Sequence, residues 1–158
     1  MLHASDMEYL RDHIKPGAKV LDVGCGSGYL CVIFSHMMND TGLVVGIEHI
    51  RELAELSVVN ISKSYKHLLE KGIVKIFEGD GRYGCKEFGP YDAINVGAVA
   101  SQPPQPLLDQ LAFGGRLVMP LGDNNSQQYV YVIDKDMNGR YTSYQTLGVV
   151  RIFEAYIY

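Results

Sequence analysis

The chain has 158 residues, a formal net charge of −4, and 47% hydrophobic against 20% charged residues. This length and balance predict one globular domain over residues 1–158, and no apolar run reaches the roughly 20 residues of a membrane span. The sequence has no cluster of Lys and Arg, which argues against a nucleic-acid partner.

Strand and helix patterns alternate along the first two thirds of the chain. Ser5 and Glu8 form a capping box that predicts a short opening helix, which Pro16 and Gly17 end. The elements predicted next are a strand over Lys19–Val23, a helix over Tyr29–Met38, a strand over Leu43–Ile47, a helix from Ile50 to Gly72, and strands over Val74–Phe77 and Tyr91–Val96.

In the last third of the chain the residue pattern instead alternates with a period of two, which is typical of strands. An α/β fold follows, with a mostly parallel sheet covered on both faces and a C-terminal antiparallel hairpin. The elements predicted here are a short helix over Pro106–Leu111 closed by Gly114 and Gly115, a strand over Arg116–Met119, and strands over Gln128–Ile133 and from Tyr141 onward, joined by a turn at residues 136–139.

Three glycines follow the first predicted strand, in the stretch VLDVGCGSGYL. A glycine-rich turn from the first strand into a helix is where the backbone of an open α/β sheet approaches a ligand. The dinucleotide pattern GxGxxG requires a glycine where Tyr29 stands, and a Walker loop requires a Lys followed by Ser or Thr that is missing here. Both phosphate-binding interpretations are therefore disfavoured.

Acidic residues surround this loop, because Asp22 precedes it while Glu48 and Asp80 end the next two strands. Such a rim would repel phosphates but would suit an ammonium, a sulfonium, ribose hydroxyls and an adenine amino group, all of which S-adenosylmethionine carries. The roles predicted are a loop of Gly24, Cys25, Gly26, Ser27 and Gly28 that admits the methionyl part, Asp22 near the ammonium, Glu48 on the ribose diol, and Asp80 with the Gly81 backbone facing adenine.

Several stretches together resemble the protein L-isoaspartate O-methyltransferases: VLDVGCGSGYL, VVGIEHI, EGDGR, PYDAINVGA and FGGRLVMPLG. The resemblance implies a Rossmann-like class I methyltransferase fold, S-adenosylmethionine as donor and S-adenosylhomocysteine as product. It also implies repair of damaged proteins by methylation of isoaspartyl and D-aspartyl carboxylates, so the expected partners are peptides and proteins. Two alternatives stay open: an O-methyltransferase of a small molecule, and a donor-binding domain without catalysis.

The chemistry of a carboxylate acceptor suits these residues. A carboxylate with a reference pKa of about 3.9 is ionised at neutral pH and requires no general base, and none is evident in the sequence. Nucleobase amine methyltransferases tend to carry Asn or Asp, two prolines and an aromatic residue after the fourth strand. This chain has Asn95 followed by Val, Gly and Ala, which disfavours that class.

The chain departs from the family pattern at both ends. A family segment like SAPHMHA supplies a serine near the reacting carboxylate, whereas this chain begins MLHA. His3 matches the last histidine of that run and Ala4 the alanine after it, and the resemblance implies that His3 is a cofactor-binding residue. We therefore expect a truncated sequence, weak activity and no certain catalytic residue. The C-terminal stretch after Gly148 differs from the family, and Asn95 stands where histidine is common.

For His49 and residues 101–104 the sequence leaves a functional role and a purely structural role as alternatives. His49 is expected either to contact adenosine or to serve the loop alone, and residues 101–104 either form an acceptor rim or a rigid turn. Histidines at metal-binding spacing are missing, so no metal is predicted. The odd, unpaired cysteines and the lack of a signal peptide predict a cytoplasmic protein, which we expect to be a monomer.

Overall fold

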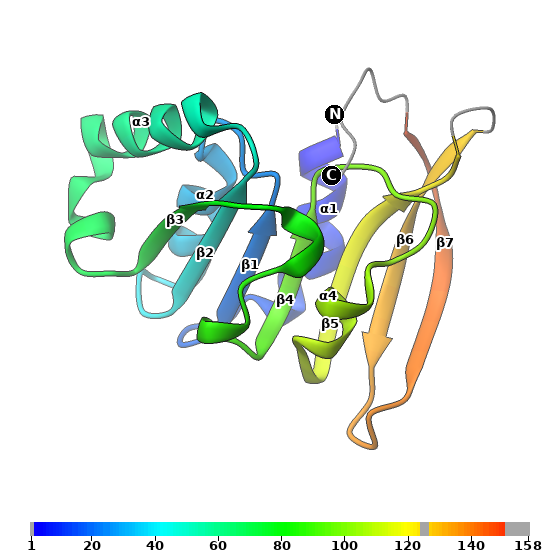
Figure 1. Ribbon diagram of the computed structural model, residues 1–158. Helices are drawn as coiled ribbons and strands as arrows, with labels where there is room; N and C mark the ends of the chain where they lie inside the picture. Colours follow the sequence, from blue (N-terminus) through cyan, green and yellow to red (C-terminus); the bar gives the residue numbers. More distant parts are fainter. Residues whose placement is uncertain (1, 124–126, 151–158) are drawn as a thin grey trace.

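The computed structural model describes residues 2–123 and 127–150, and the side chains of residues 6–123 and 127–146. Helices and strands alternate along most of it (Figure 1). The α-helices are α1 (Leu2–Leu10), α2 (Tyr29–Met37), α3 (Arg51–Glu70) and α4 (Gln105–Asp109); the 3₁₀ turns are η1 (Arg11–His13), η2 (Gly81–Tyr83) and η3 (Lys86–Phe88). The strands are β1 (Lys19–Val23), β2 (Leu43–Glu48), β3 (Val74–Glu78), β4 (Tyr91–Val96), β5 (Leu111–Leu121), β6 (Gln128–Lys135) and β7 (Tyr141–Val150).

The strands form one seven-stranded sheet in the order β3-β2-β1-β4-β5-β6-β7. Strands β1 to β5 pair in parallel, whereas β6 and β7 are antiparallel to their neighbours. The predicted parallel sheet with a C-terminal hairpin is thus confirmed. The strand order reverses at β1, so the carboxyl ends of β1, β2, β3 and β4 share the edge where ligands bind in such sheets.

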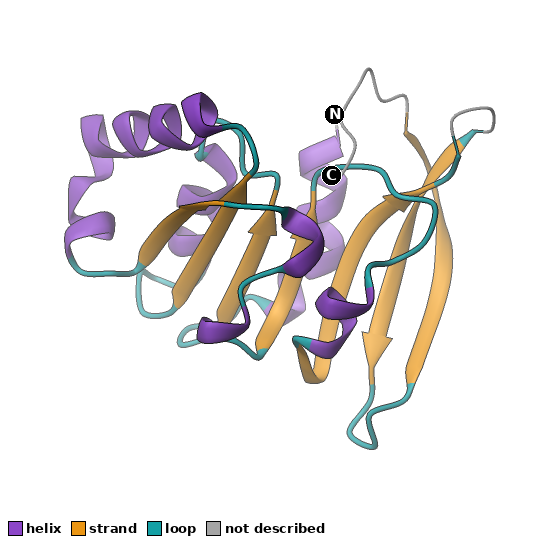
Figure 2. Cartoon of the chain, in the orientation of Figure 1, coloured by secondary structure: helices purple, strands orange, loops and turns teal. Residues whose placement is uncertain are grey.

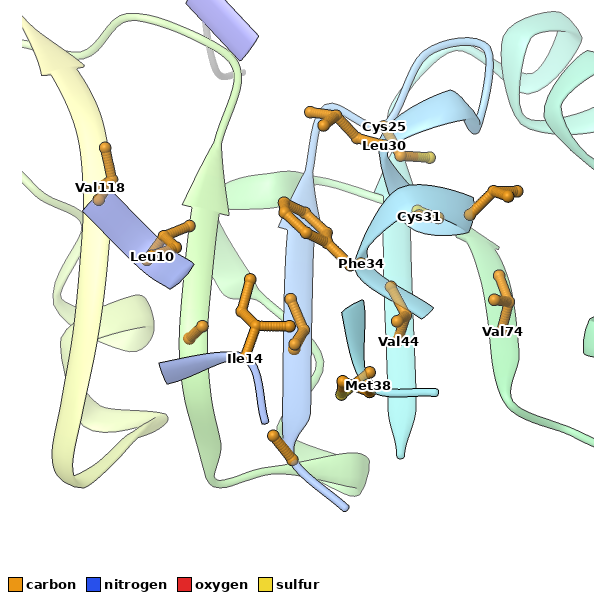
Figure 3. Close-up of a cluster of buried hydrophobic side chains, with 14 of the residues drawn as sticks. Leu10, Ile14, Cys25, Leu30, Cys31, Phe34, Met38, Val44, Val74 and Val118 are labelled. Atoms are coloured by element: carbon orange, nitrogen blue, oxygen red, sulfur yellow. The ribbon is translucent and has the colours of Figure 1, made fainter. Parts of the chain in front are cut away.

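Two hydrophobic clusters fill the two faces of the sheet. On one face, α1, α2 and α3 pack over side chains of β1, β2 and β4, with Phe34 fully buried among them (Figure 3). On the other face, α4 inserts Leu107 against β1, β4 and β5, and the turns η2 and η3 lie on this side as well (Figure 2). No helix in residues 2–123 and 127–150 is long and apolar enough to cross a membrane.

The opening helix differs from its prediction at both ends. It begins at Leu2, so Ser5 lies inside it and the predicted capping box is wrong. It gives way to a 3₁₀ turn at Arg11, and the Ile14 N–H donates to the Arg11 carbonyl at 3.3 Å. The apolar spacing predicts one helix up to Ile14, whereas this stretch is an α-helix followed by a 3₁₀ turn.

The region around Gly114 and Gly115 also corrects its prediction. Helix α4 ends at Asp109, and both glycines lie inside β5 rather than closing a helix. A step of two residues in β4, from Tyr91 to Ala93, is matched by a step of five in β5, from Leu111 to Arg116, so the glycines occupy an irregularity of this strand. A Cβ on Gly115 would lie 2.8 Å from the Ala112 carbonyl oxygen, which explains why glycine is required.

Candidate functional site at the carboxyl edge of the sheet

The loop between β1 and α2 contains three glycines in left-handed conformations, with φ of 79° at Gly24, 53° at Gly26 and 83° at Gly28. Side chains rarely adopt such angles, which explains the glycine pattern. The N–H groups of Gly24 and Cys25 donate to the carbonyl of Ile47 in β2 at 2.8 and 3.1 Å. The loop is therefore fastened to the neighbouring strand.

The three glycines have different surroundings. Nothing lies within 4 Å of a Cβ placed on Gly26, and at Gly24 only a carbonyl carbon of Gly97 comes as near as 4.0 Å. A Cβ on Gly28 would instead lie 3.0 Å from side-chain atoms of both Ser57 and Ile61 in α3. The first two glycines thus border open space at the rim, whereas the third allows close packing of α3.

This difference predicts unequal effects of alanine substitutions. Gly28→Ala combines backbone strain with a clash against α3 and is expected to lower the free energy of unfolding by about 2–3 kcal/mol. Gly26→Ala has the strain without the clash, so a loss of about 1 kcal/mol is expected. Urea unfolding of the two variants measures both values; equal losses would contradict the assignment.

Glu48, at the end of β2, joins this loop to the start of α3. One carboxylate oxygen accepts from the Gly26 N–H at 3.0 Å, and the other accepts from the Ile50 N–H at 3.2 Å. His49 Nδ1 lies 3.3 Å from the second oxygen, and the His49 side chain is 42% exposed. Glu48 itself is only 4% exposed, so the carboxylate is held in one orientation at the strand end.

Asp22 lies beneath the loop and not on the rim with the other predicted acids. It is 1% exposed. Asn95 Nδ2 in β4 donates to one of its oxygens at 3.0 Å, and the Cys31 thiol in α2 contacts the other at 3.5 Å. Asp22 therefore ties together two strands and the first turn of the helix that follows the loop.

Asp80 follows β3 and caps the turn η2. Its carboxylate accepts from the Arg82 backbone N–H at 3.0 Å, and the Arg82 guanidinium lies 2.6 Å from the closer oxygen. The hydrogen bonds from Arg82 hold the pKa of Asp80 below its usual value. Gly81 is buried, and a Cβ there would lie 2.4 Å from Val23, so glycine is required for this turn to reach β1.

A cavity of about 660 Å³ opens beside this ion pair. Arg82, residues 99–105, Gly122 and Asp123 line it. It includes residues 101–104, for which the sequence left a rim and a rigid turn as alternatives. The segment after β4 thus lies on the cavity, next to the turn that Asp80 caps.

The other residues predicted for the site contribute in different ways. Cys25 turns its side chain into the core, where it is 7% exposed, so only its backbone belongs to the loop (Figure 3). The Ser27 carbonyl accepts from Asn60 Nδ2 of α3 at 3.3 Å. His3 lies in α1, and its side chain is outside the described residues. The C-terminal stretch from Arg151 is also outside them.

The sequence did not indicate the site contacts or burial of three residues, although it marked Asn95 as a departure from the family pattern. Arg82 pairs with Asp80, and its position two residues after a strand-end acid was the available signal. Asn95 is the partner of Asp22 across 73 residues, which no local pattern could indicate. Asp6 is 5% exposed in α1, and nothing in its sequence neighbourhood separates it from a solvated helix residue.

Relatives of the chain are found along most of its length. A family model described as Protein-L-isoaspartate(D-aspartate) O-methyltransferase matches residues 1–153. Protein-L-isoaspartate O-methyltransferase 2 of Arabidopsis thaliana is 50% identical over 87% of this chain, and the Protein-L-isoaspartate O-methyltransferase of Caenorhabditis elegans is 49% identical over 88% of it. The chain spans only 44% and 61% of these two proteins.

The crystal structure of a relative has the same fold as this chain. A Plasmodium falciparum protein named as a protein-L-isoaspartate O-methyltransferase, in complex with S-adenosyl-L-homocysteine, superposes with a TM-score of 0.85 at 31% identity. The match covers 99% of this chain and 73% of that one. The predicted fold, the Rossmann-like one of class I S-adenosylmethionine-dependent methyltransferases, is confirmed. The chain belongs to the protein-L-isoaspartate(D-aspartate) O-methyltransferase family.

Proposed function

We propose that this chain has the activity of a protein-L-isoaspartate O-methyltransferase. It transfers a methyl group from S-adenosylmethionine to the free carboxylate of L-isoaspartyl and D-aspartyl residues in damaged proteins. The observation that carries the proposal is the contact of Glu48 with the Gly26 N–H, which joins the glycine loop to the end of β2 at 3.0 Å. Family membership and the S-adenosyl-L-homocysteine in the Plasmodium falciparum relative support it.

The residues at this edge fit an S-adenosyl ligand. The open space at Gly24 and Gly26 suits a methionyl group lying against the loop backbone. A carboxylate oxygen offers two acceptor positions, so the Glu48 oxygen that accepts the Gly26 N–H can still accept from a ribose hydroxyl, whereas the other oxygen is shared by the Ile50 N–H and His49 Nδ1. The backbone of buried Gly81 and the carboxylate of Asp80 suit the adenine end.

The chain's own residues would act mainly by positioning. When bound, S-adenosylmethionine supplies a methyl group on a positively charged sulfur. An isoaspartyl carboxylate has a pKa of about 3.5–4 and is already ionised at neutral pH, so no residue has to remove a proton from it. The cavity beside Arg82 and residues 99–105 would orient the acceptor peptide, and such orientation can lower a barrier by up to about 7–11 kcal/mol.

A methyl-transfer assay on paired peptides tests this function. Two peptides of one sequence, one with L-isoaspartate and one with aspartate, are incubated with the protein and radiolabelled S-adenosylmethionine. We expect methyl ester on the isoaspartyl peptide and none above background on the aspartyl peptide. Equal rates would reject the proposal. Binding of S-adenosylhomocysteine without turnover on either peptide would instead favour a donor-binding domain, or an enzyme for a small molecule.

We also propose that the protein works in the reducing cytoplasm. Cys25 and Cys31 support this, because both thiols are buried and lie near the same point of the core: a Cβ on Gly46 would be 3.0 and 3.1 Å from Cys31 and Cys25 sulfur. Unpaired neighbouring thiols persist where the thiol pool is reduced. Recovery of the protein mainly from a secreted or periplasmic fraction would contradict this location.

A further inference from the structure

The side chain of Gln110, just after α4, is bound to the chain segment that follows η2. Its Nε2 donates to the Tyr83 carbonyl at 2.8 Å, and its Oε1 accepts from the Cys85 N–H at 2.9 Å. Gln110 is only 7% exposed. A carboxamide offers a donor and an acceptor side by side, which an ionised carboxylate or an alkyl group does not. Both contacts therefore depend on this kind of side chain.

The backbone of Gln110 is itself held in place. Its N–H donates to the Pro106 carbonyl at 3.1 Å, and its carbonyl accepts from the Tyr91 N–H at 2.8 Å, where β4 begins. The hydroxyl of fully buried Tyr91 donates to the Cys85 carbonyl. The end of α4 and the start of β4 thus hold the segment after η2 together.

Gly84 lies between the two backbone groups that Gln110 binds. Its φ is 61°, in the left-handed region, and a Cβ at this position would overlap with the Gln110 amide oxygen. The backbone therefore lies directly against the amide, and glycine is required for this approach.

The turn before Gly84 is closed by its own hydrogen bonds. The Tyr83 N–H donates to the Asp80 carbonyl at 3.1 Å, and the Gly84 N–H donates to the Gly81 carbonyl at 3.2 Å. Residues 80–84 therefore form one unit, and a contact that fixes its end also fixes the direction of the Asp80 carboxylate at its start.

This unit has few anchors other than Gln110. Its start is held at β2, where the Gly79 N–H donates to the Glu48 carbonyl at 3.0 Å, and against β1. The large side chains of the turn contribute little burial, because Arg82 is exposed and Tyr83 is 65% exposed. The orientation of the turn therefore depends on hydrogen bonds at its two ends.

We propose that Gln110 is a positioning residue of the donor site: it holds η2, and with it the Asp80 carboxylate, where adenine binds. This inference rests on the proposed function, because that function places adenine at Asp80 and Gly81. Without the amide, the Tyr83 carbonyl and the Cys85 N–H need water as a partner, and the end of the turn is no longer fastened. The turn then tilts about its fixed start, and Asp80 leaves the adenine amino group.

The test compares two ligands by calorimetric titration: S-adenosylhomocysteine, and S-inosylhomocysteine, in which an oxygen replaces the adenine amino group. The proteins are the wild type, Gln110→Met, which keeps the length of the side chain without the amide, and Val132→Ala. Val132 is fully buried in β6, so its truncation lowers stability without touching η2.

We expect the preference for S-adenosylhomocysteine over the inosyl analogue to fall about tenfold in Gln110→Met, because one hydrogen bond to a charged group is lost. Val132→Ala should keep the preference of the wild type. Equal weakening of both ligands by Gln110→Met would show a purely structural role and would overturn the inference.

A double variant tests whether the effect passes through Asp80. Asp80→Ala alone should lose the preference for the adenine ligand, and adding Gln110→Met to it should lower that preference no further. Additive losses in the double variant would contradict a role of Gln110 through Asp80.

Amide hydrogen exchange gives a readout that needs no ligand. The Cys85 N–H is the group that Gln110 binds, so its protection relative to the amides of β1 should fall in Gln110→Met and not in Val132→Ala. Unchanged protection of Cys85 would overturn the inference. If the wild type bound neither ligand, the proposed function would be rejected, and exchange at Cys85 would still decide whether Gln110 holds the turn.

Discussion

Replacement of Glu48 by glutamine is expected to weaken S-adenosylhomocysteine binding by about 100-fold. Hydrogen bonds to a charged group contribute about 1.5–3 kcal/mol each, so loss of the charge from the proposed ribose contact and from the loop contacts that hold Glu48 in place costs about 3 kcal/mol, or about two factors of ten. The glutamine amide also cannot accept from both Gly26 and Ile50, as the two Glu48 oxygens do at 3.0 and 3.2 Å. Calorimetric titration measures the affinity.

The control for this substitution is Glu52→Gln. Glu52 is an exposed acid in the first turn of α3, so its replacement removes the same charge from the same region without touching the loop. Thermal unfolding of both variants without ligand separates damage to the fold from loss of ribose contacts. Binding by Glu48→Gln within a factor of three of the control would show that Glu48 does not hold the ligand.

The second large effect concerns stability and pH. Burial raises the pKa of Asp6 from 3.8 to about 7 on folding. Between these values the unfolded chain has lost its proton while the folded protein keeps it, so the free energy of unfolding falls as the pH rises and the loss is complete above pH 7. At about 1.4 kcal/mol per pKa unit the loss is on the order of 4 kcal/mol.

Asp6→Asn removes this penalty. We expect the variant to match the wild type near pH 4 and to exceed its free energy of unfolding increasingly up to pH 7, with a constant difference at higher pH. Urea unfolding at several pH values between 4 and 8 gives the curve, and Asp12→Asn, which replaces an exposed acid in η1, should run parallel to the wild type. A difference between Asp6→Asn and the wild type that does not change with pH would contradict the assignment.

Much of the fold is readable from local patterns. The strands over Lys19–Val23 and Tyr91–Val96 have the predicted bounds, because each is a short apolar run between clear turn residues. The prediction fails at Gly114 and Gly115, where two glycines resemble a helix end. Both glycines instead lie in an irregularity of β5, where β5 has more residues than β4 between the same two strand pairings. This pairing is part of the tertiary structure, so a local sequence pattern does not reveal it.

The candidate site, like the fold, could be predicted from the sequence only in part. Glu48 and Asp80 are recognisable as acids at strand ends, and the glycine loop is recognisable from its spacing. Their partners depend on the folded arrangement: the Gly26 N–H reaches Glu48 across 22 residues, and Asn95 reaches Asp22 across 73. The burial of Asp6 requires α1 to dock on the sheet, so a helix read alone cannot reveal it.

The contact between Gly28 and α3 has a consequence for how this chain can vary. Since a Cβ at position 28 would lie 3.0 Å from side-chain atoms of Ser57 and Ile61, these three positions form one steric unit that spans the glycine loop and α3. A bulkier residue at position 57 would press on the backbone of Gly28 at the end of the glycine loop. Among relatives we therefore anticipate correlated side-chain volumes at positions 57 and 61 wherever position 28 remains glycine.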